Sequence, residues 1–176
     1  LIGIGYLFFL GSDDTLYSKT VLDQLSEILK TNNVDVIYGN VISKVFNGVY
    51  DGEFTFSKLS KKNICHQAIF LKKTVFNRIG GFNLKYKGCA DYDHNIRWFF
   101  SSKISRLHMD LIITNYGDGG YSSLNRDLVF DKDRNIKIFI HGIGKLSAYE
   151  LLCLLKKEKS TCNYSLVDNV SNCSLS

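Results

Sequence analysis

The sequence predicts an α/β protein with a mixed sheet. Apolar stretches of strand length alternate with amphipathic stretches at helical spacing along the 176-residue chain, as in proteins whose strands are joined by helices. The dipeptide Asn47-Gly48 lies between two β-type runs and is a strong signal for a tight hairpin. Because a hairpin adds antiparallel pairing to the alternating units, we expect strands of both directions in one sheet. An apolar fraction of 45% is sufficient for a packed core.

The first predicted strand spans residues 1–10 and ends in a turn. The five apolar residues from Tyr6 to Leu10 leave no polar side for water, so we expect this strand to be buried on both faces. It should therefore have neighbouring strands on both sides. We expect the additional neighbours to come from an upstream part of a longer protein.

The remaining elements follow from apolar spacing and from turn residues. Helices are expected at residues 18–31, 73–79 and 90–101, and again from residue 127 onward with a break at Gly142 to Gly144. Strands are expected at residues 34–38, 41–46, 49–56, 64–71, 104–107 and 111–116. Residues 58–63 are expected to form a polar loop, and residues 117–123 a glycine-rich loop.

The first strand runs into Gly11, Ser12 and the adjacent carboxylates of Asp13 and Asp14. Ligands of open α/β sheets bind at the carboxyl ends of the strands, and carboxylate oxygens suit a divalent cation. The same residues also form good turns and helix caps. Spacing alone favours neither interpretation.

A second pair of acids, Asp91 and Asp93, opens the helix predicted at residues 90–101. A carboxylate separate from a cation site can remove a proton from an attacking group. The structural alternative is that these acids complement the helix dipole and that Asp93 pairs with Arg97 four residues later. Taken alone, the pair favours the structural alternative.

Composition argues against several classes of function. The net charge is +5, but the basic residues are scattered, which does not indicate nucleic acid as a partner. The cysteines contain no Cys-x-x-Cys pair, so the spacing of a zinc knuckle is missing. No apolar run reaches the roughly 18 residues of a membrane span.

Several short motifs occur in a characteristic order, and together they carry a resemblance to a known family. The motifs are Phe9 to Asp14, His66-Gln67 followed by an apolar strand and Lys72-Lys73, Gly80 to Asn83, Ala90 to Asp93 with Arg97, and Gly119 to Ser122. Over residues 1 to about 125 the chain resembles the second half of a family 2 glycosyltransferase. The resemblance implies an incomplete GT-A fold, which is a Rossmann-like mixed sheet. Beyond the part that the resemblance covers, apolar spacing predicts a helical carboxyl-terminal extension at residues 126–160, and the polar residues 161–176 are expected to form a flexible tail.

The resemblance also implies an activity. Such enzymes are hexosyltransferase-like: they move a sugar from a nucleotide-sugar donor to a hydroxyl of a glycan or a lipid-linked sugar, usually with inversion and with Mg²⁺ or Mn²⁺. Their usual setting is polysaccharide, lipopolysaccharide or glycan synthesis in the cytoplasm or at the inner face of the membrane. The amino-terminal βαβ unit with which members of this family bind the nucleotide has no counterpart in this sequence. The alternative is an inactive fragment that binds a nucleotide or a sugar.

Residue roles carry over from the family only where the motifs match. Asp91 matches the catalytic base, and Asp13 matches the acid that holds the metal and the diphosphate. Ser12 and Asp14 match donor-binding positions, although Asp14 can be structural. Gly11 stands where many members carry Asp or Asn, and Ala90 where many carry Glu. The positions that match contacts to acceptor or diphosphate, or that support the helix, are His66, Gln67, Asp93 and Arg97.

The segment Leu151 to Leu155 is followed by Lys156-Lys157 and allows two interpretations. Burial of the leucines against the domain is the one that we favour. The alternative is peripheral contact with an anionic membrane surface.

Overall fold

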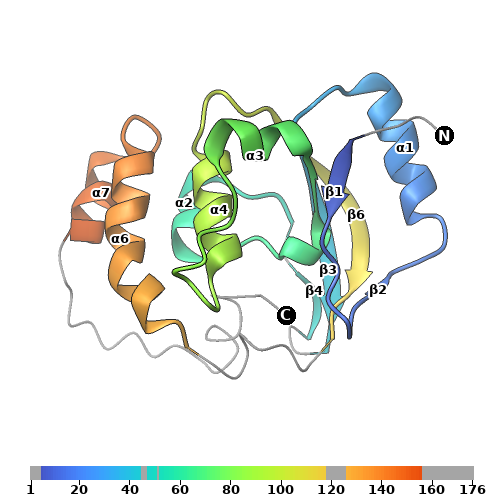
Figure 1. Ribbon diagram of the computed structural model, residues 1–176, viewed down its shortest axis with the longest axis horizontal. Helices are drawn as coiled ribbons and strands as arrows, with labels where there is room; N and C mark the ends of the chain where they lie inside the picture. Colours follow the sequence, from blue (N-terminus) through green and yellow to red (C-terminus); the bar gives the residue numbers. More distant parts are fainter. Residues whose placement is uncertain (1–4, 45–46, 51, 118–125, 156–176) are drawn as a thin grey trace.

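The computed structural model describes residues 5–44, 47–50, 52–117 and 126–155. It confirms the α/β class and the mixed sheet (Figure 1). The strands are β1 (Tyr6–Phe8), β2 (Thr15–Leu16), β3 (Val36–Ser43), β4 (Gly48–Tyr50), β5 (Ile69–Lys72) and β6 (Arg106–Asn115). The helices are α1 (Val21–Thr31), α2 (Phe56–Lys61), the 3₁₀ turn η1 (His66–Ala68), α3 (Lys73–Ile79), α4 (Ala90–Phe99), α6 (Leu128–Gly142) and α7 (Ala148–Leu155).

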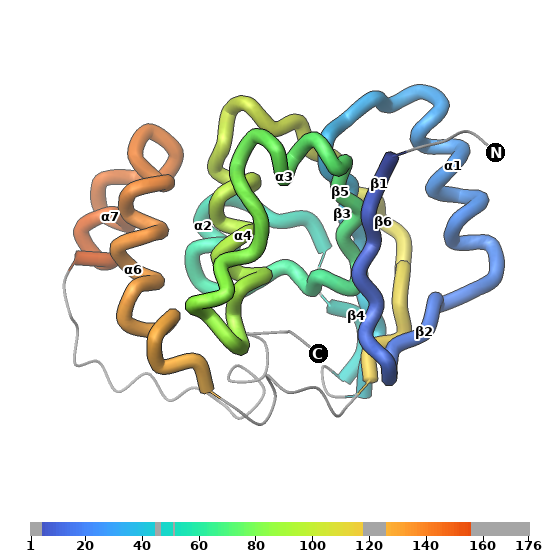
Figure 2. Tube along the Cα trace, viewed as in Figure 1, coloured from blue at the N-terminus to red at the C-terminus, as the bar shows by residue number. Residues whose placement is uncertain are grey.

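Strand order and direction define the edge of the sheet that matters for function. The order is β1-β5-β3-β6-β2, and β4 pairs with the second half of β3. Strands β3 and β6 are parallel, whereas β5 runs antiparallel to both β1 and β3. The ends of β1, β3 and β6 therefore meet the beginning of β5 at one edge of the sheet, which we call the carboxyl edge (Figure 2).

The helices form layers on the sheet. Figure 1 shows α1 on one side of the sheet, α2, α3 and α4 on the other, and α6 with α7 outside α4. Apolar spacing explains the orientation of α1, because its buried Val21 and Leu25 lie one turn apart on the side that packs on the core. Helix α4 is the most deeply buried helix, and Tyr92, Trp98 and Phe99 are among the largest fully buried side chains in the described residues.

A glycine allows the two central parallel strands to approach each other closely. A Cβ atom at Gly39 would lie 2.7 Å from the carbonyl oxygen of Leu111 and 2.8 Å from Cγ1 of Ile113. The pairing of β3 with β6 also shifts register on both sides of Asn40, as at a β-bulge. Residue 39 therefore has no room for a side chain.

The predicted hairpin and most of the predicted helices are confirmed. Asn47 and Gly48 have φ angles of +50° and +137°, and they join β3 to its antiparallel partner β4. The helices predicted at residues 18–31, 73–79 and 90–101 correspond to α1, α3 and α4. The chain is also helical beyond residue 127, with a break after Gly142. The tail at residues 161–176 lies outside the described residues.

Other expectations were wrong. The first strand is not buried on both faces, since Leu7 is 38% exposed. The reason is its position, because among the described strands β1 pairs only with β5 and lies at the end of the sheet. It also ends at Phe8, so that Phe9 and Leu10, which are 39% and 41% exposed, lie beyond it. Residues 58–63 are not a loop but lie mostly in α2, whose first turn is capped by the Thr55 hydroxyl. The two strands predicted between residues 104 and 116 are one continuous strand, β6.

Candidate functional site

The turn after β1 is held in place by Asp14. The carboxylate of Asp14 is buried, and its Oδ2 accepts the backbone N–H of Gly11 at 3.1 Å. Its Oδ1 accepts the N–H of Gly117 at 2.8 Å. Because both oxygens accept backbone hydrogen bonds, Asp14 ties the turn to the end of β6. This geometry is that of a structural carboxylate.

Asp13 has a different environment, because it lies at the exposed tip of this turn with Ser12. Its carboxylate packs against the backbone of Gly117 just beyond β6, where a Cβ atom would come within 2.6 Å of Asp13 Oδ2. The exposed carboxylate is therefore placed at the carboxyl edge, next to the end of a neighbouring strand. A ligand at this edge could reach it from solvent.

Tyr116 connects this turn with the second acidic site. Tyr116 is a buried residue, and burial raises its pKa, with further increases from the charges of Cys65, Asp14, Asp13 and Asp91. These acids are distant in sequence, yet all lie within electrostatic reach of one phenol. Hydrogen bonds at the end of β6 bring the two sites to the same region: Gly117 donates to Asp14, and Thr114 donates to the carbonyl of Gln67, whose neighbour His66 faces Asp91.

Asp91 is almost completely buried, with 1% of its surface exposed. Its Oδ2 accepts a hydrogen bond from Asn63 Nδ2 at 2.7 Å, and its Oδ1 accepts the N–H of Tyr92 at 2.7 Å. His66 Nδ1 lies 3.6 Å from Asp91 Oδ2. Burial raises the pKa of Asp91, while the neighbouring His66, the Tyr92 N–H and Asn63 lower it. A carboxylate with a raised pKa beside a histidine is suited to accept a proton.

His66 and Gln67 begin the approach to β5 at the carboxyl edge, in the turn η1. His66 is 8% exposed and is thus the more accessible member of the pair with Asp91. Gln67 is buried, and within the described residues its Oε1 has no hydrogen-bond partner. Its backbone carbonyl accepts the hydroxyl of Thr114, so the position of residue 67 is fixed. An amide held in this way can donate to or accept from a bound molecule.

Asp93 and Arg97 are engaged with the scaffold. Arg97 donates to Asp93 Oδ2 at 2.9 Å, and Lys137 of α6 lies 2.7 Å from Asp93 Oδ1. Arg97 also donates to the carbonyls of Ile79 and Gly81 at 2.5 and 2.7 Å. These contacts join α4 to the end of α3 and to α6. They agree with the structural alternative raised from the sequence.

A cavity of about 640 Å³ opens at the carboxyl edge beside this region. It lies between the β3–β4 hairpin and the end of β6. None of the predicted site residues lines it, but Asp13 packs against Gly117, which does. Its volume is typical of a small-molecule site. It is lined by Ile42, Ser43, Lys44, Asn47, Gly48, Asn115, Tyr116 and Gly117.

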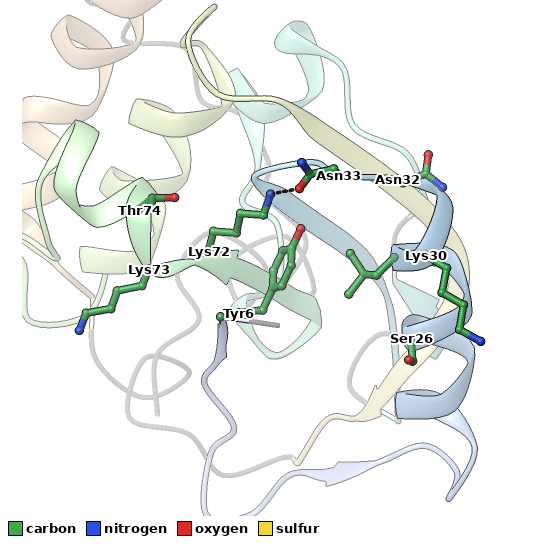
Figure 3. Close-up of a pocket in the computed structure, with 10 residues that line it drawn as sticks. Tyr6, Ser26, Lys30, Asn32, Asn33, Lys72, Lys73 and Thr74 are labelled. Atoms are coloured by element: carbon green, nitrogen blue, oxygen red, sulfur yellow. Dashed lines mark hydrogen bonds between the residues drawn. The ribbon is translucent and has the colours of Figure 1, made fainter. Parts of the chain in front are cut away.

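A second cavity, of about 470 Å³, lies at the opposite edge of the sheet (Figure 3). It is formed by the start of β1, the end of β5 and the end of α1. Tyr6 stands in its wall, and Lys72 donates to Asn33 Oδ1 at 2.5 Å. None of the predicted site residues lines this cavity.

The predicted cation was tested against the donor groups present. Within the described part of the chain, no three His, Cys, Asp or Glu side chains gather in a way that would enclose a metal ion. Mg²⁺, however, is commonly held by one or two carboxylates together with substrate phosphates rather than by a cage of protein ligands. The exposed Asp13 fits that mode, whereas Asp14 uses both oxygens on backbone amides.

Sequence reasoning missed four residues that the structure places here. Asn63 donates to Asp91, and Tyr116, Gly117 and Lys44 line the cavity. The sequence did predict the hairpin and the strand that ends at residue 116, and both of these elements reach the carboxyl edge. Nothing in their own spacing singled out these residues, because their roles depend on contacts through space.

The sequence was also compared with known proteins. No family model matches the chain. It is similar to the PGL/p-HBAD biosynthesis glycosyltransferases of Mycobacterium bovis (strain BCG / Pasteur 1173P2) and Mycobacterium tuberculosis (strain ATCC 25618 / H37Rv), with 37% identity over 130 residues in each case. The matched region covers 72% of this chain and 51% of each relative. The chain thus spans about half the length of these glycosyltransferases, to which it is homologous.

Proposed function

We propose that this chain supplies the catalytic base and the metal-binding carboxylate of a nucleotide-sugar-dependent glycosyltransferase of family 2. The observation that carries the proposal is the position of two carboxylates at the carboxyl edge: Asp13 is exposed beside Gly117, and Asp91 is buried beside His66. Its similarity to glycosyltransferases of PGL/p-HBAD biosynthesis supports the same activity. We further propose a glycan or a lipid-linked sugar as the acceptor.

The proposed reaction is a direct displacement with inversion. Asp91, supported by His66, accepts the proton of the acceptor hydroxyl as its oxygen bonds to C1 of the sugar. The bond between C1 and the diphosphate oxygen breaks, and the nucleoside diphosphate leaves with the electron pair. Gln67, held at the carboxyl edge with its Oε1 unpaired among the described residues, is placed to hydrogen-bond the acceptor or the diphosphate. Lys44 at the cavity wall is placed to offset the phosphate charge.

Asp13 would hold the metal in this scheme. A bound Mg²⁺ or Mn²⁺ would stabilise the negative charge that develops on the leaving diphosphate. The other ligands would be donor phosphates and water, as is usual for Mg²⁺. Asp14 and Ser12 would keep the turn in the shape that presents Asp13.

The test is transfer or hydrolysis of a panel of UDP-, GDP- and dTDP-sugars in the presence of MnCl₂, using the natural protein that contains this sequence. Asp91→Asn should lower kcat by at least about 100-fold, the usual contribution of a positioned base. Asp131→Asn is the matched control, because Asp131 is a surface acid paired with Arg126. Equal turnover by Asp91→Asn and the control would overturn the assignment of the base.

Asp13→Asn should abolish the dependence of donor binding on Mn²⁺. Asp23→Asn, an exposed acid in the first turn of α1, is its control. The alternative function is a nucleotide- or sugar-binding module without catalysis. Tight Mn²⁺-dependent nucleotide binding with no turnover of any donor would favour that module over the enzyme.

A membrane surface is a further proposed partner. None of the helices in the described part of the chain has the length and apolarity to cross a bilayer. Leu151 and Leu154 of α7 pack against the core, in line with the favoured interpretation, but Leu152 and Leu155 are 56% and 51% exposed. Ile140 on α6 is 59% exposed. With Lys156 and Lys157 next in the sequence, these side chains suit the surface of an anionic bilayer.

Vesicle co-sedimentation tests this contact. Binding to vesicles with 30% phosphatidylserine should exceed binding to phosphatidylcholine vesicles, and Leu152→Ser with Leu155→Ser should lose it. Ser substitutions at Val49 and Leu84, which are exposed on other elements, are the controls. Equal binding to both vesicle types, or a dimer that buries these leucines instead, would overturn the proposed contact.

A further inference from the structure

A chain of buried hydrogen bonds leads from the interior of α4 to the carboxylate of Asp91. Trp98 Nε1 donates to Asn95 Oδ1 at 2.8 Å, and Asn95 Nδ2 donates to Asn63 Oδ1 at 2.9 Å. Asn63 Nδ2 then donates to Asp91 Oδ2 at 2.7 Å. Trp98, Asn95, Asn63 and Asp91 are each exposed by 2% or less, so water does not compete for these bonds.

The direction of the chain is fixed at Asn95, although an amide can in principle turn its oxygen and nitrogen either way. An indole N–H can only donate, so the Oδ1 of Asn95 must face Trp98. A backbone carbonyl can only accept, and Ile64 O accepts from Asn95 Nδ2 at 3.1 Å. The nitrogen of Asn95 therefore faces Asn63 and requires an oxygen there. That requirement turns the NH₂ group of Asn63 toward Asp91.

We propose that Trp98 and Asn95 are positioning residues that act through Asn63, by fixing its amide so that a hydrogen-bond donor always faces the carboxylate of Asp91. A donor at 2.7 Å favours the ionised form of a carboxylate, which is the form that a base requires. An unfixed Asn63 would offer its oxygen to Asp91 part of the time and would disfavour that form. This inference rests on the proposed role of Asp91 as the base.

The other groups that face Asp91 do not take over the role of this series of hydrogen bonds. His66 on η1 approaches Oδ2 at 3.6 Å, and the phenol of Tyr116 at the end of β6 lies within electrostatic reach. The backbone N–H of Tyr92 occupies Oδ1. Asn63 differs from these groups because its amide could turn either its nitrogen or its oxygen toward Asp91, and the bond from Asn95 decides which of the two faces the carboxylate.

The decisive experiment measures the titration of Asp91 itself and needs no substrate. The protein is labelled with ¹³C at the aspartate carboxyl carbons, and the Asp91→Asn spectrum identifies the Asp91 signal. Asn95→Leu should raise the midpoint of the Asp91 titration by roughly 1 pH unit, about the value of one hydrogen bond to a charged group. Trp98→Phe should raise it by less, because Ile64 O still orients Asn95.

Phe99→Leu is the matched control, because Phe99 is a buried neighbour of Trp98 on the same helix and is outside the chain of hydrogen bonds. It should lose stability without moving the Asp91 midpoint. In kinetic assays the acidic limb of kcat/KM should move with the titration in Asn95→Leu, while the plateau at high pH stays within about threefold of the parent.

The outcomes separate the positioning role of Trp98 and Asn95 from the role of Asp91 as the base. An unchanged Asp91 midpoint in folded Asn95→Leu and Trp98→Phe proteins would overturn the positioning role. Failure of both variants to fold, with Phe99→Leu folded, would assign the chain of hydrogen bonds to core stability and would also overturn it. A shifted midpoint combined with full turnover in Asp91→Asn would support the positioning role but refute the proposed base.

Discussion

The carboxylate of Asp13 and the backbone of Gly117 are in direct contact, so that no side chain fits between them. A Cβ atom at residue 117 would lie 2.6 Å from Asp13 Oδ2 and 2.8 Å from the Asp13 carbonyl oxygen. The glycine after β6 thus determines how closely the turn after β1 approaches the cavity at the carboxyl edge. A substitution there tests the turn without altering any acid.

Gly117→Ala should displace the carboxylate of Asp13 and weaken Mn²⁺-dependent donor binding by roughly 10- to 100-fold, since a misplacement of about 1 Å can have effects of that size. Isothermal titration with UDP and MnCl₂ gives the measurement. Gly81→Ala is the control, because a Cβ atom at Gly81 would meet no heavy atom within 4 Å. The same affinity in both variants would show that the position of Asp13 does not matter for the donor.

The pH profile of the reaction should reflect the burial of Asp91. Burial raises the pKa of Asp91, and His66 partly offsets this rise. The base works only when ionised, so kcat/KM should increase with pH and reach half its maximum above the ordinary aspartate value of about 3.9. His66→Gln removes the offsetting charge and should move this limb to higher pH.

His108→Gln is the control for that profile, since His108 lies on β6 near Asn40 and not beside Asp91. If His66→Gln and His108→Gln have the same acidic limb as the parent, His66 does not influence the base.

His94 should make the fold sensitive to mild acid. It is fully buried between Phe76 and Phe82, and burial, together with Arg97, lowers the pKa of His94 to about 4, although Asp93 acts in the opposite direction. Between pH 6.5 and pH 4 the unfolded chain binds a proton here that the folded chain does not. Stability is therefore fully present above pH 6.5 and is lost as the pH falls through this window.

His94→Phe should remove up to about 3 kcal/mol of that acid-induced loss, from the difference between the two pKa values. Urea unfolding at pH 7.5 and at pH 4.5 measures the loss in parent and variant, and the difference between them isolates His94 from other groups. An identical loss in both proteins would contradict the prediction.

Gly39→Ala should destabilise the protein without touching the site. The added methyl group would meet the carbonyl oxygen of Leu111 at 2.7 Å and the side chain of Ile113 at 2.8 Å. Separating the central strands should cost about 1–3 kcal/mol, as in other overpacked cores. Chemical denaturation measures this cost, and Gly5→Ala, which has open space around it, should be close to the parent. Equal midpoints for the two variants would show that β3 and β6 tolerate separation.

The sequence was most informative where a local pattern determines local structure. Apolar spacing predicted α1 because one side of that helix packs on the core. It predicted α4 because Tyr92, Ile96 and Phe99 recur at helical spacing, although α4 is buried nearly all round. Asn47-Gly48 predicted the hairpin because few other residues adopt positive φ angles without strain. Helix α2 was missed because six residues are too few to show a helical period, and its cap at Thr55 is also ordinary loop chemistry.

The site was predictable only in part, for a related reason. Asp13, Asp91 and His66 were predicted as site residues because they stand at the ends of predicted elements, where ligands often bind. Asn63 and Asn95 were not, because their roles come from partners that are distant in sequence and meet only after folding. The burial of Asp91 could not be predicted either, since its partners Asn63 and His66 lie on other segments of the chain.

The position of β1 at the end of the sheet has a practical consequence for handling this polypeptide. On the side away from β5 its backbone amides and carbonyls pair with no described strand, and Leu7, Phe9 and Leu10 present apolar surface beside them. Such an edge is a template for strands from other molecules. Expression of residues 1–176 alone should therefore yield protein that precipitates as its concentration rises. A solubilising fusion partner at the amino terminus, close to β1, should give better material for crystallisation.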